Sequence, residues 1–91
     1  MSVQVSIPTP LRNLTNNVDT VEASGATIGE VLTDLEKQFP GIGERLLDAK
    51  GEVRRFVNIY LNGEDIRFLE NQTTAVKTND EVSIVPAIAG G

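Results

Sequence analysis

A single strongly amphipathic stretch, residues 27–39, constrains the fold of this chain more than any other feature. Apolar side chains recur there with the period of an α-helix, and polar side chains fill the opposite face. Thr27 and Glu30 have the spacing of a capping box, and Pro40-Gly41 ends the pattern. The apolar stripe consists of Ile28, Val31, Leu32, Leu35 and Phe39. We therefore expect one main helix that buries one face.

Two segments with the period of a β-strand precede this helix. Alternating apolar residues predict a strand over residues 3–7 and a second strand, with a less regular start, over residues 18–23. Val21 and Ala23 are expected to face inward in the second strand. Because residues 11–17 read as a connecting loop, the two strands are predicted to form an antiparallel hairpin.

Three further strands are predicted after the helix. Residues 42–49 favour a short helical turn, and residues 56–61 form the strongest strand pattern in the chain. Asn62-Gly63 indicates a type I′ turn, since both central positions of that turn need positive φ, and its partner strand is expected at residues 66–68. A loop then leads to a last strand at residues 81–85, with Val82 and Ile84 facing inward. Pro86, which has no N–H, marks where the chain leaves the sheet.

These elements, in the order β-β-α-β-β-β, predict an α+β fold in which one main helix packs on one face of a mixed sheet of four to five strands. The order resembles the β-grasp, or ubiquitin-like, fold. That resemblance implies that the first and last strands lie side by side at the centre of the sheet. We expect a β-grasp domain over residues 1–86 and a flexible, reactive C-terminal tail over residues 87–91.

The composition excludes many kinds of chemistry. Among 91 residues there is no Cys and no His, which excludes disulfides, thiolate catalysis, the usual transition-metal ligands and the commonest general base. A net charge of −5 argues against a nucleic-acid partner. No apolar run approaches the ~20 residues of a membrane span, and we see no secretory signal. We expect a cytoplasmic protein that binds neither membrane nor nucleic acid, is not an enzyme and has no metal or bound cofactor.

Motifs that resemble active sites are better explained as surface or loop features. Gly41-Ile42-Gly43 lacks the third glycine of a dinucleotide fingerprint and follows a helix instead of a strand. Arg54-Arg55-Phe56, with Arg45 and Lys50 nearby, is interpreted as a solvated face. The acidic pairs Glu64-Asp65 and Asp80-Glu81 fit solvated turns.

The remaining candidate chemistry lies in the last stretch of the sequence, Val85-Pro86-Ala87-Ile88-Ala89-Gly90-Gly91. Glycine lets another protein's backbone or a narrow channel approach closely, so the α-carboxylate of Gly91 is expected to be the most accessible reactive group. Adenylation makes a carboxylate electrophilic, and sulfide or a persulfide can then displace AMP to give a thiocarboxylate. The chain has no phosphate-binding loop, so a partner enzyme must use the ATP. The predicted site is Gly91 as the reactive position, with Gly90, Ala89, Ile88 and Ala87 as the tail that enters a partner's channel.

Five segments along the chain have the character of a known protein family, namely Val5-Ser6-Ile7-Pro8-Thr9, Ala23-Ser24-Gly25, Asp34-Leu35-Glu36, Arg55-Phe56-Val57-Asn58-Ile59-Tyr60 and Pro86-Ala87-Ile88-Ala89-Gly90-Gly91. Together they resemble the small sulfur carriers of the MoaD/ThiS group, which are ubiquitin-like proteins ending in Gly-Gly. The resemblance spans essentially the whole chain and is closest to the CysO-type carriers of cysteine biosynthesis.

This resemblance implies a set of partner enzymes. An adenylating, sulfur-transferring activating enzyme would use ATP to install sulfur on Gly91. A pyridoxal-phosphate-dependent cysteine synthase would take that sulfur onto an activated serine, and a metallopeptidase would release the cysteine left on the tail. A docking face on the sheet is expected as well, but the residues of that face are not identified by the sequence.

Three alternatives stay open. The sulfur could instead go to molybdopterin or thiamine synthesis, because the reactive end of the carrier would be the same. The protein could be a ubiquitin-like modifier conjugated to target lysines through Gly91. It could also be a β-grasp interaction module whose tail has no chemical role.

Overall fold

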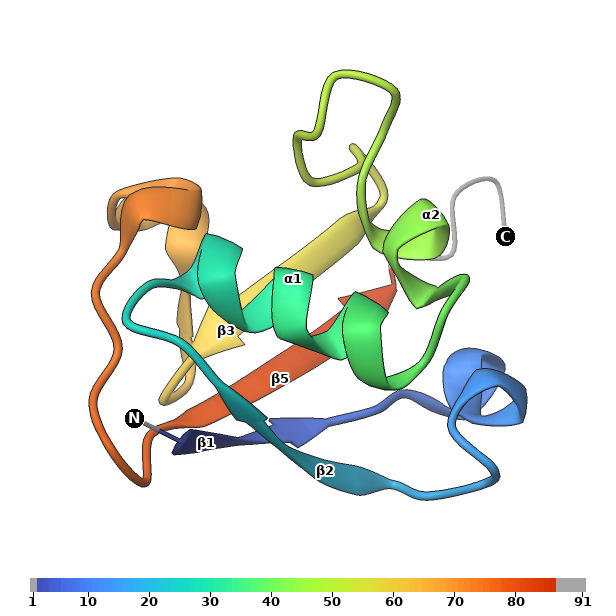
Figure 1. Ribbon diagram of the computed structural model, residues 1–91. Helices are drawn as coiled ribbons and strands as arrows, with labels where there is room; N and C mark the ends of the chain where they lie inside the picture. The colour runs from blue at the N-terminus through green and yellow to red at the C-terminus, as the bar shows by residue number, and fades with distance from the viewer. Residues whose placement is uncertain (1, 87–91) are drawn as a thin grey trace.

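A computed structural model describes residues 2–86 of the chain as a five-stranded mixed sheet with one main helix, α1 (Ile28–Gln38), lying across one face (Figure 1). A second, short helix, α2 (Ile42–Leu46), follows α1. The strands are β1 (Ser2–Ser6), β2 (Thr20–Ser24), β3 (Val57–Leu61), β4 (Glu64–Asp65) and β5 (Glu81–Pro86). Three 3-10 helices occupy the connections: η1 (Thr9–Leu14), η2 (Ile66–Phe68) and η3 (Asn71–Thr73). The predicted α+β class is confirmed.

The strand order is β2-β1-β5-β3-β4. β1 runs parallel to β5, with Val5 beside Val82, while the β1–β2, β3–β5 and β3–β4 pairs are antiparallel. The first and last strands therefore lie side by side at the centre of the sheet, as the β-grasp resemblance implied.

The local chemistry of α1 explains both where it begins and which face it buries. The Thr27 hydroxyl accepts a hydrogen bond from the Glu30 N–H (3.3 Å), and the Glu30 carboxylate reaches back to the Ala26 N–H (2.9 Å). The first bond satisfies an amide of the first helical turn, and the second fixes the residue that precedes the N-cap. The predicted stripe is buried at Ile28, Val31, Leu32 and Leu35, whereas Phe39 follows the helix and is half-buried.

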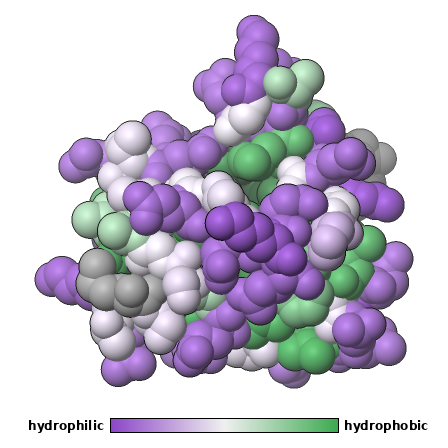
Figure 2. All heavy atoms as spheres, in the orientation of Figure 1, coloured by the Kyte–Doolittle hydropathy of each residue, from purple (hydrophilic) through white to green (hydrophobic). Residues whose placement is uncertain are grey.

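The hydrophobic core lies between α1 and the sheet. Inward-facing residues of β1, β2, β3 and β5 alternate with exposed ones, as expected for a sheet covered on one face. The strand residues that face α1 are Val3, Val5, Val21, Ala23, Val57, Ile59, Leu61, Val82 and Ile84. On the helix-covered side, hydrophilic side chains dominate the outer surface over α1 (Figure 2).

Two predicted elements differ from the structure. Residues 66–68 form the 3-10 helix η2, so the prediction of a strand there was wrong; the partner of β3 is the two-residue β4. The Asp65 carboxylate accepts a hydrogen bond from the Arg67 N–H (2.9 Å), which caps η2 and turns the chain out of the strand. The predicted loop at residues 11–17 overlaps the 3-10 helix η1.

The other boundaries are closer to expectation. β2 begins at Thr20, not at Val18, and α2 covers only the first part of the predicted turn at residues 42–49. The Asn62-Gly63 turn is confirmed, with φ of 52° and 87° at its two central residues. Within the part of the chain that the structure describes, no helix combines the length and the apolar character that crossing a bilayer would require.

The Asp34 carboxylate links α1 to β2 by a hydrogen bond and makes a pH-dependent contribution to the free energy of unfolding. The Ser24 N–H (3.0 Å) and the Gln38 side-chain amide (2.8 Å) both donate to Asp34. The pKa of Asp34 is lowered, mainly by the bond from Ser24 and secondly by that from Gln38. Since the folded-state pKa lies below the unfolded one, Asp34 stabilises the fold above its unfolded pKa of about 4, and this contribution disappears as the pH falls through the folded pKa.

We therefore expect Asp34→Asn to flatten the dependence of stability on pH below about pH 4. Urea midpoints of the wild type and the variant, measured across that range, check this. Asp19→Asn, at an exposed position in the loop before β2, serves as the control. A wild-type slope in Asp34→Asn would contradict the role assigned to these two hydrogen bonds.

Candidate functional site

The residues predicted to carry the chemistry lie outside the described residues. These are Ala87, Ile88, Ala89, Gly90 and Gly91. The structure does describe the strand to which they are attached, β5, whose last residue is Pro86. The candidate site is therefore built from the elements around the C-terminal end of β5.

β5 is paired on both sides over its first half and on the β3 side alone at its end. Val82 and Ile84 are almost fully buried under α1. β1 pairs with the first half of β5, and β3 pairs with it as far as Pro86. The first half of β5 therefore belongs to the buried centre of the sheet, whereas the position of Pro86 depends on its pairing with the start of β3.

The pairing of Val57 with Pro86 shows how a proline fits at the end of a central strand. The Val57 N–H donates to the Arg54 carbonyl (3.0 Å), and the Val57 carbonyl accepts from the Arg67 guanidinium (2.8 Å). Both backbone groups of Val57 thus have partners outside β5, so this position of the ladder needs no N–H from Pro86.

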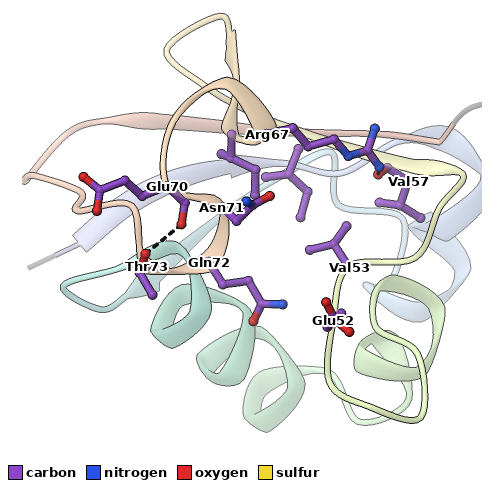
Figure 3. A pocket seen from close by; sticks show the side chains of 10 residues that line it. Glu52, Val53, Val57, Arg67, Glu70, Asn71, Gln72 and Thr73 are labelled. Atoms are coloured by element: carbon purple, nitrogen blue, oxygen red, sulfur yellow. Dashed lines mark hydrogen bonds between the residues drawn. The ribbon is translucent and has the colours of Figure 1, made fainter.

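Arg67 is the functional candidate that the sequence did not reveal. Its side chain reaches from η2 to the start of β3, where the guanidinium contacts the Val57 carbonyl and, at 2.7 Å, the Asn58 side-chain oxygen. Figure 3 shows Arg67 extended toward Val57. Residues 66–68 were predicted as a strand, so neither the periodicity nor the spacing of the sequence indicated this contact.

Three exposed apolar side chains belong to β5 near its end or to segments linked to the start of β3. Val85 is 43% exposed and sits opposite Asn58, and Phe56, which immediately precedes β3, is 51% exposed. Phe68, the residue after Arg67, is 83% exposed. Single exposed apolar residues are common, but these three flank one structural unit, the Arg67-linked start of β3, and are candidates for contact with a partner.

The second face of the sheet, opposite α1, is polar. Outward-facing residues of β1, β3 and β5 meet there in cross-strand pairs such as Tyr60 with Ser83 and Gln4 with Glu81. A shallow hollow of about 260 Å³ lies on it, lined by Gln4, Ser6, Thr20, Glu81, Val82 and Ser83. The hollow lies beside the first half of β5, and the face continues along that strand to the exposed Val85 near its end. We assign this face as the candidate docking face that the sequence left unplaced.

A separate pocket of about 300 Å³ lies on the other side of β3 (Figure 3). Its apolar walls come from Val53, Val57, Ile59 and Ile66, and its polar rim from Glu52, Arg67, Glu70, Asn71, Gln72 and Thr73. Rim groups already bond to the backbone: the Thr73 hydroxyl donates to the Glu70 carbonyl and the Gln72 amide to the Gly51 carbonyl. We therefore assign this pocket no chemical role.

The glycine motif at the start of α2 is explained by an internal contact. The Gly41 and Gly43 N–H groups both donate to the Glu36 carboxylate, at distances down to 2.7 Å. The amides that a bound phosphate would need are therefore occupied by a side chain of α1. Among residues 2–86, no three side chains of the metal-binding kinds come together.

Comparison with known proteins identifies the family of this chain. The ThiS family matches residues 5–91. The curated sulfur carrier protein CysO of Mycobacterium tuberculosis is 52% identical over 93 residues and covers 100% of both chains. Small archaeal modifier protein 3 of Haloferax volcanii is 41% identical over 66 residues, covering 72% of this chain and 71% of that protein.

The solved structures agree with the fold described above. In the crystal structure of the Amycolatopsis orientalis BexX/CysO complex, one chain is 45% identical to this protein, with a TM-score of 0.92 and coverage of 98% of this chain and 99% of that one. The strand order, the position of β5 and the match along almost the whole sequence lead to one assignment: the chain belongs to the ThiS family.

Proposed function

We propose that this protein is a sulfur carrier that delivers sulfur for cysteine biosynthesis from a thiocarboxylate at Gly91. The observation that carries the proposal is the 52% identity, over the full length of both chains, to the sulfur carrier protein CysO. The structure supports it with a tail attachment point at the centre of the sheet, beside a polar face open to a partner.

The proposed reaction uses the α-carboxylate of Gly91. A carboxylate oxygen attacks the α-phosphorus of ATP and releases pyrophosphate, which leaves an acyl-adenylate on the carrier. The sulfur of hydrosulfide then attacks the carbonyl carbon and expels AMP, giving the thiocarboxylate. A persulfide donor would instead give an acyl disulfide, and a thiol of the partner would cleave its S–S bond, releasing the thiocarboxylate and leaving a disulfide on the partner. The carrier thereby divides one difficult transfer into two easier steps. The chain supplies the reacting carbonyl, and the partner supplies the ATP site and the sulfur.

This chemistry divides the chain into two parts with different roles. Residues 1–86 would form the domain that partners recognise, and residues 87–91 would be the flexible tail that enters their active sites. In the tail, Ala87, Ile88, Ala89 and Gly90 would pass through a narrow channel and place Gly91 at the reacting atoms. The small side chains at these positions, with Ile88 the largest, favour such a passage.

The partners belong to the same proposal. They are an ATP-dependent activating enzyme, a pyridoxal-phosphate-dependent cysteine synthase that accepts the sulfur, and a metallopeptidase that releases the product from the tail. The CysO relative from Amycolatopsis orientalis forms a complex with BexX, which supports a carrier that docks on partner proteins. We place the protein in the cytoplasm, where ATP-dependent activation would occur. Delivery to molybdopterin or thiamine synthesis would use the same activated tail.

A second candidate function is conjugation to proteins through Gly91. The observation that favours it is the 41% identity to small archaeal modifier protein 3. A modifier would form isopeptide bonds with lysines, so extracts of the source cells would contain higher-mass conjugates that survive boiling and reductant. Conjugates that disappear when Gly90 and Gly91 are deleted would establish this function, and their absence would count against it.

ATP–pyrophosphate exchange tests the activation step. We expect extracts of the source cells to contain an enzyme whose exchange of labelled pyrophosphate into ATP depends on added wild-type protein. The protein lacking Gly90 and Gly91 is the matched control and should support no exchange. Exchange that does not respond to the wild-type protein would contradict the proposed function.

A further inference from the structure

We propose that Arg67 is a positioning residue that fixes the point at which the C-terminal tail leaves the sheet. This inference rests on the proposed function, because only a tail that must enter another enzyme's active site needs a fixed origin. Arg67 is placed on η2, outside the tail and outside the reacting atoms.

The guanidinium of Arg67 donates to several groups at the start of β3, and we call this set of hydrogen bonds the Arg67 fork. One terminal nitrogen donates to the Asn58 side-chain oxygen at 2.7 Å. The other donates to the carbonyls of Val57 (2.8 Å), Arg55 (3.2 Å) and Arg54 (3.5 Å). One side chain therefore orders the turn before β3 and the first two residues of the strand.

The Arg67 fork contacts the edge of β3 at residues that the short neighbouring strand, β4, does not reach. β3 lies between β5 and β4, but β4 pairs only with Tyr60 and Leu61. Within the described residues, the start of β3 thus has no strand neighbour on its β4 side. The guanidinium supplies donors there, so the Val57 carbonyl is satisfied although the sheet does not continue.

The residues that the fork holds are those that pair with the end of β5. Val57 lies opposite Pro86, and Asn58 lies opposite Val85. If these two pairs opened, the last anchored residue would become Ile84, and the free chain would lengthen by two residues, or up to roughly 7 Å. The partner would then have to order a longer segment during docking, which weakens binding without altering the reacting group.

The chemistry of the fork requires arginine. A guanidinium is planar and presents several N–H donors in a fixed geometry, whereas a lysine ammonium is a single flexible charge. Arg67→Lys therefore keeps the charge and removes the fork, and Arg67→Ala removes both. The pair of variants separates positioning from recognition of the positive charge by a partner.

Two measurements on the full-length protein test the proposal. The first is amide hydrogen exchange at Val57 and Val85, with the buried Val82 of β5 as reference. The second is steady-state exchange of pyrophosphate into ATP by the activating enzyme. This enzyme is purified from source-cell extracts by following the exchange activity that depends on the wild-type protein. In both Arg67 variants we expect exchange at Val57 and Val85 to accelerate about tenfold, equivalent to about 1.4 kcal/mol, and the KM for the protein to rise about tenfold with kcat within twofold.

Two control variants complete the test. Asn62→Gly removes a similar tie at the opposite end of the same strand pair, where the Asn62 side chain bonds to Asp80 and to the Glu81 N–H. Glycine also retains the positive φ of that position. Arg55→Ala removes an exposed charge beside the fork. Both controls should keep the wild-type KM.

Each other outcome overturns the proposal in an identifiable way. Normal KM in both Arg67 variants would mean that the origin of the tail need not be fixed. A normal KM in Arg67→Lys with a raised KM in Arg67→Ala would mean that partner proteins recognise the positive charge at this position and that the fork itself is not needed. An equal rise in Asn62→Gly would mean that general destabilisation is the cause. If the wild-type protein stimulates no exchange of pyrophosphate into ATP in source-cell extracts, the proposed function itself is wrong.

Discussion

Replacing Gly91 with alanine is expected to slow thiocarboxylate formation about a hundredfold, because small displacements at a reacting centre have effects of this size. The added methyl group would stand where a partner's channel must close around the chain and would displace the carboxylate from the α-phosphorus of ATP. We expect folding not to change, since the core of the described residues, 2–86, is built from side chains between Val3 and Ile84. Mass spectrometry of the reaction with the activating enzyme, ATP and sulfide measures the rate.

The control for this prediction is the protein lacking Gly90 and Gly91. It should form no thiocarboxylate and should unfold at the wild-type temperature. A Gly91→Ala variant with a normal rate would refute the steric role of glycine. Cells that grow normally with the shortened protein would instead favour an interaction module whose tail has no chemical role.

Truncating Leu35 to alanine is expected to have the largest effect on stability among these predictions. Leu35 lies on α1, is fully buried and packs in the single core between the helix and the sheet. A buried Leu→Ala change leaves a cavity and typically costs about 3 kcal/mol. In a domain of this size we expect the thermal midpoint to fall by roughly 15 °C.

Lys37→Ala, two residues further along α1, is the matched control. Its side chain is exposed, so the same helix loses surface atoms instead of core atoms. Its stability should stay within about 0.5 kcal/mol of the wild type. A small effect of Leu35→Ala, measured by thermal and urea unfolding, would contradict the assignment of α1 as the element that closes the core.

Much of the fold could be predicted because it depends on local periodicity. The α1 stripe, the alternation in β3 and the Asn62-Gly63 turn each specify one backbone conformation from neighbouring residues. The placement of β1 beside β5 followed from resemblance to a fold, since parallel pairing of distant strands has no local signal in the sequence.

The errors occurred where a side chain bonded to the backbone decides the conformation and periodicity does not. Residues 66–68 have the composition of a strand, yet the Asp65 cap and the Arg67 fork hold them as a 3-10 helix. Likewise, η1 is stabilised by Arg12, whose guanidinium donates to the Ile7 carbonyl at 3.0 Å. The bonds of Asp65 and Arg12 are local but have no periodic signal, whereas the contacts of Arg67 with the start of β3 exist only once the sheet has formed.

The candidate site could be predicted in part. The reactive position, Gly91, came from the terminal sequence and stays a prediction, because it lies outside the described residues. The structure added what the sequence could not show, namely the sheet-centre anchor of β5, the open polar face and the role of Arg67 at the start of β3. Each of these combines residues from two or more separate segments.

The intact mass of the protein isolated from its native cells tests the proposed carrier function most directly. We predict a species in which one oxygen is replaced by sulfur, localised to Gly91 by fragmentation, and a second species with cysteine attached at the same residue. The cysteine adduct would also identify cysteine synthesis as the destination of the sulfur. Protein that carries neither change, when isolated rapidly under conditions that preserve a synthetic thiocarboxylate standard, would contradict the carrier function.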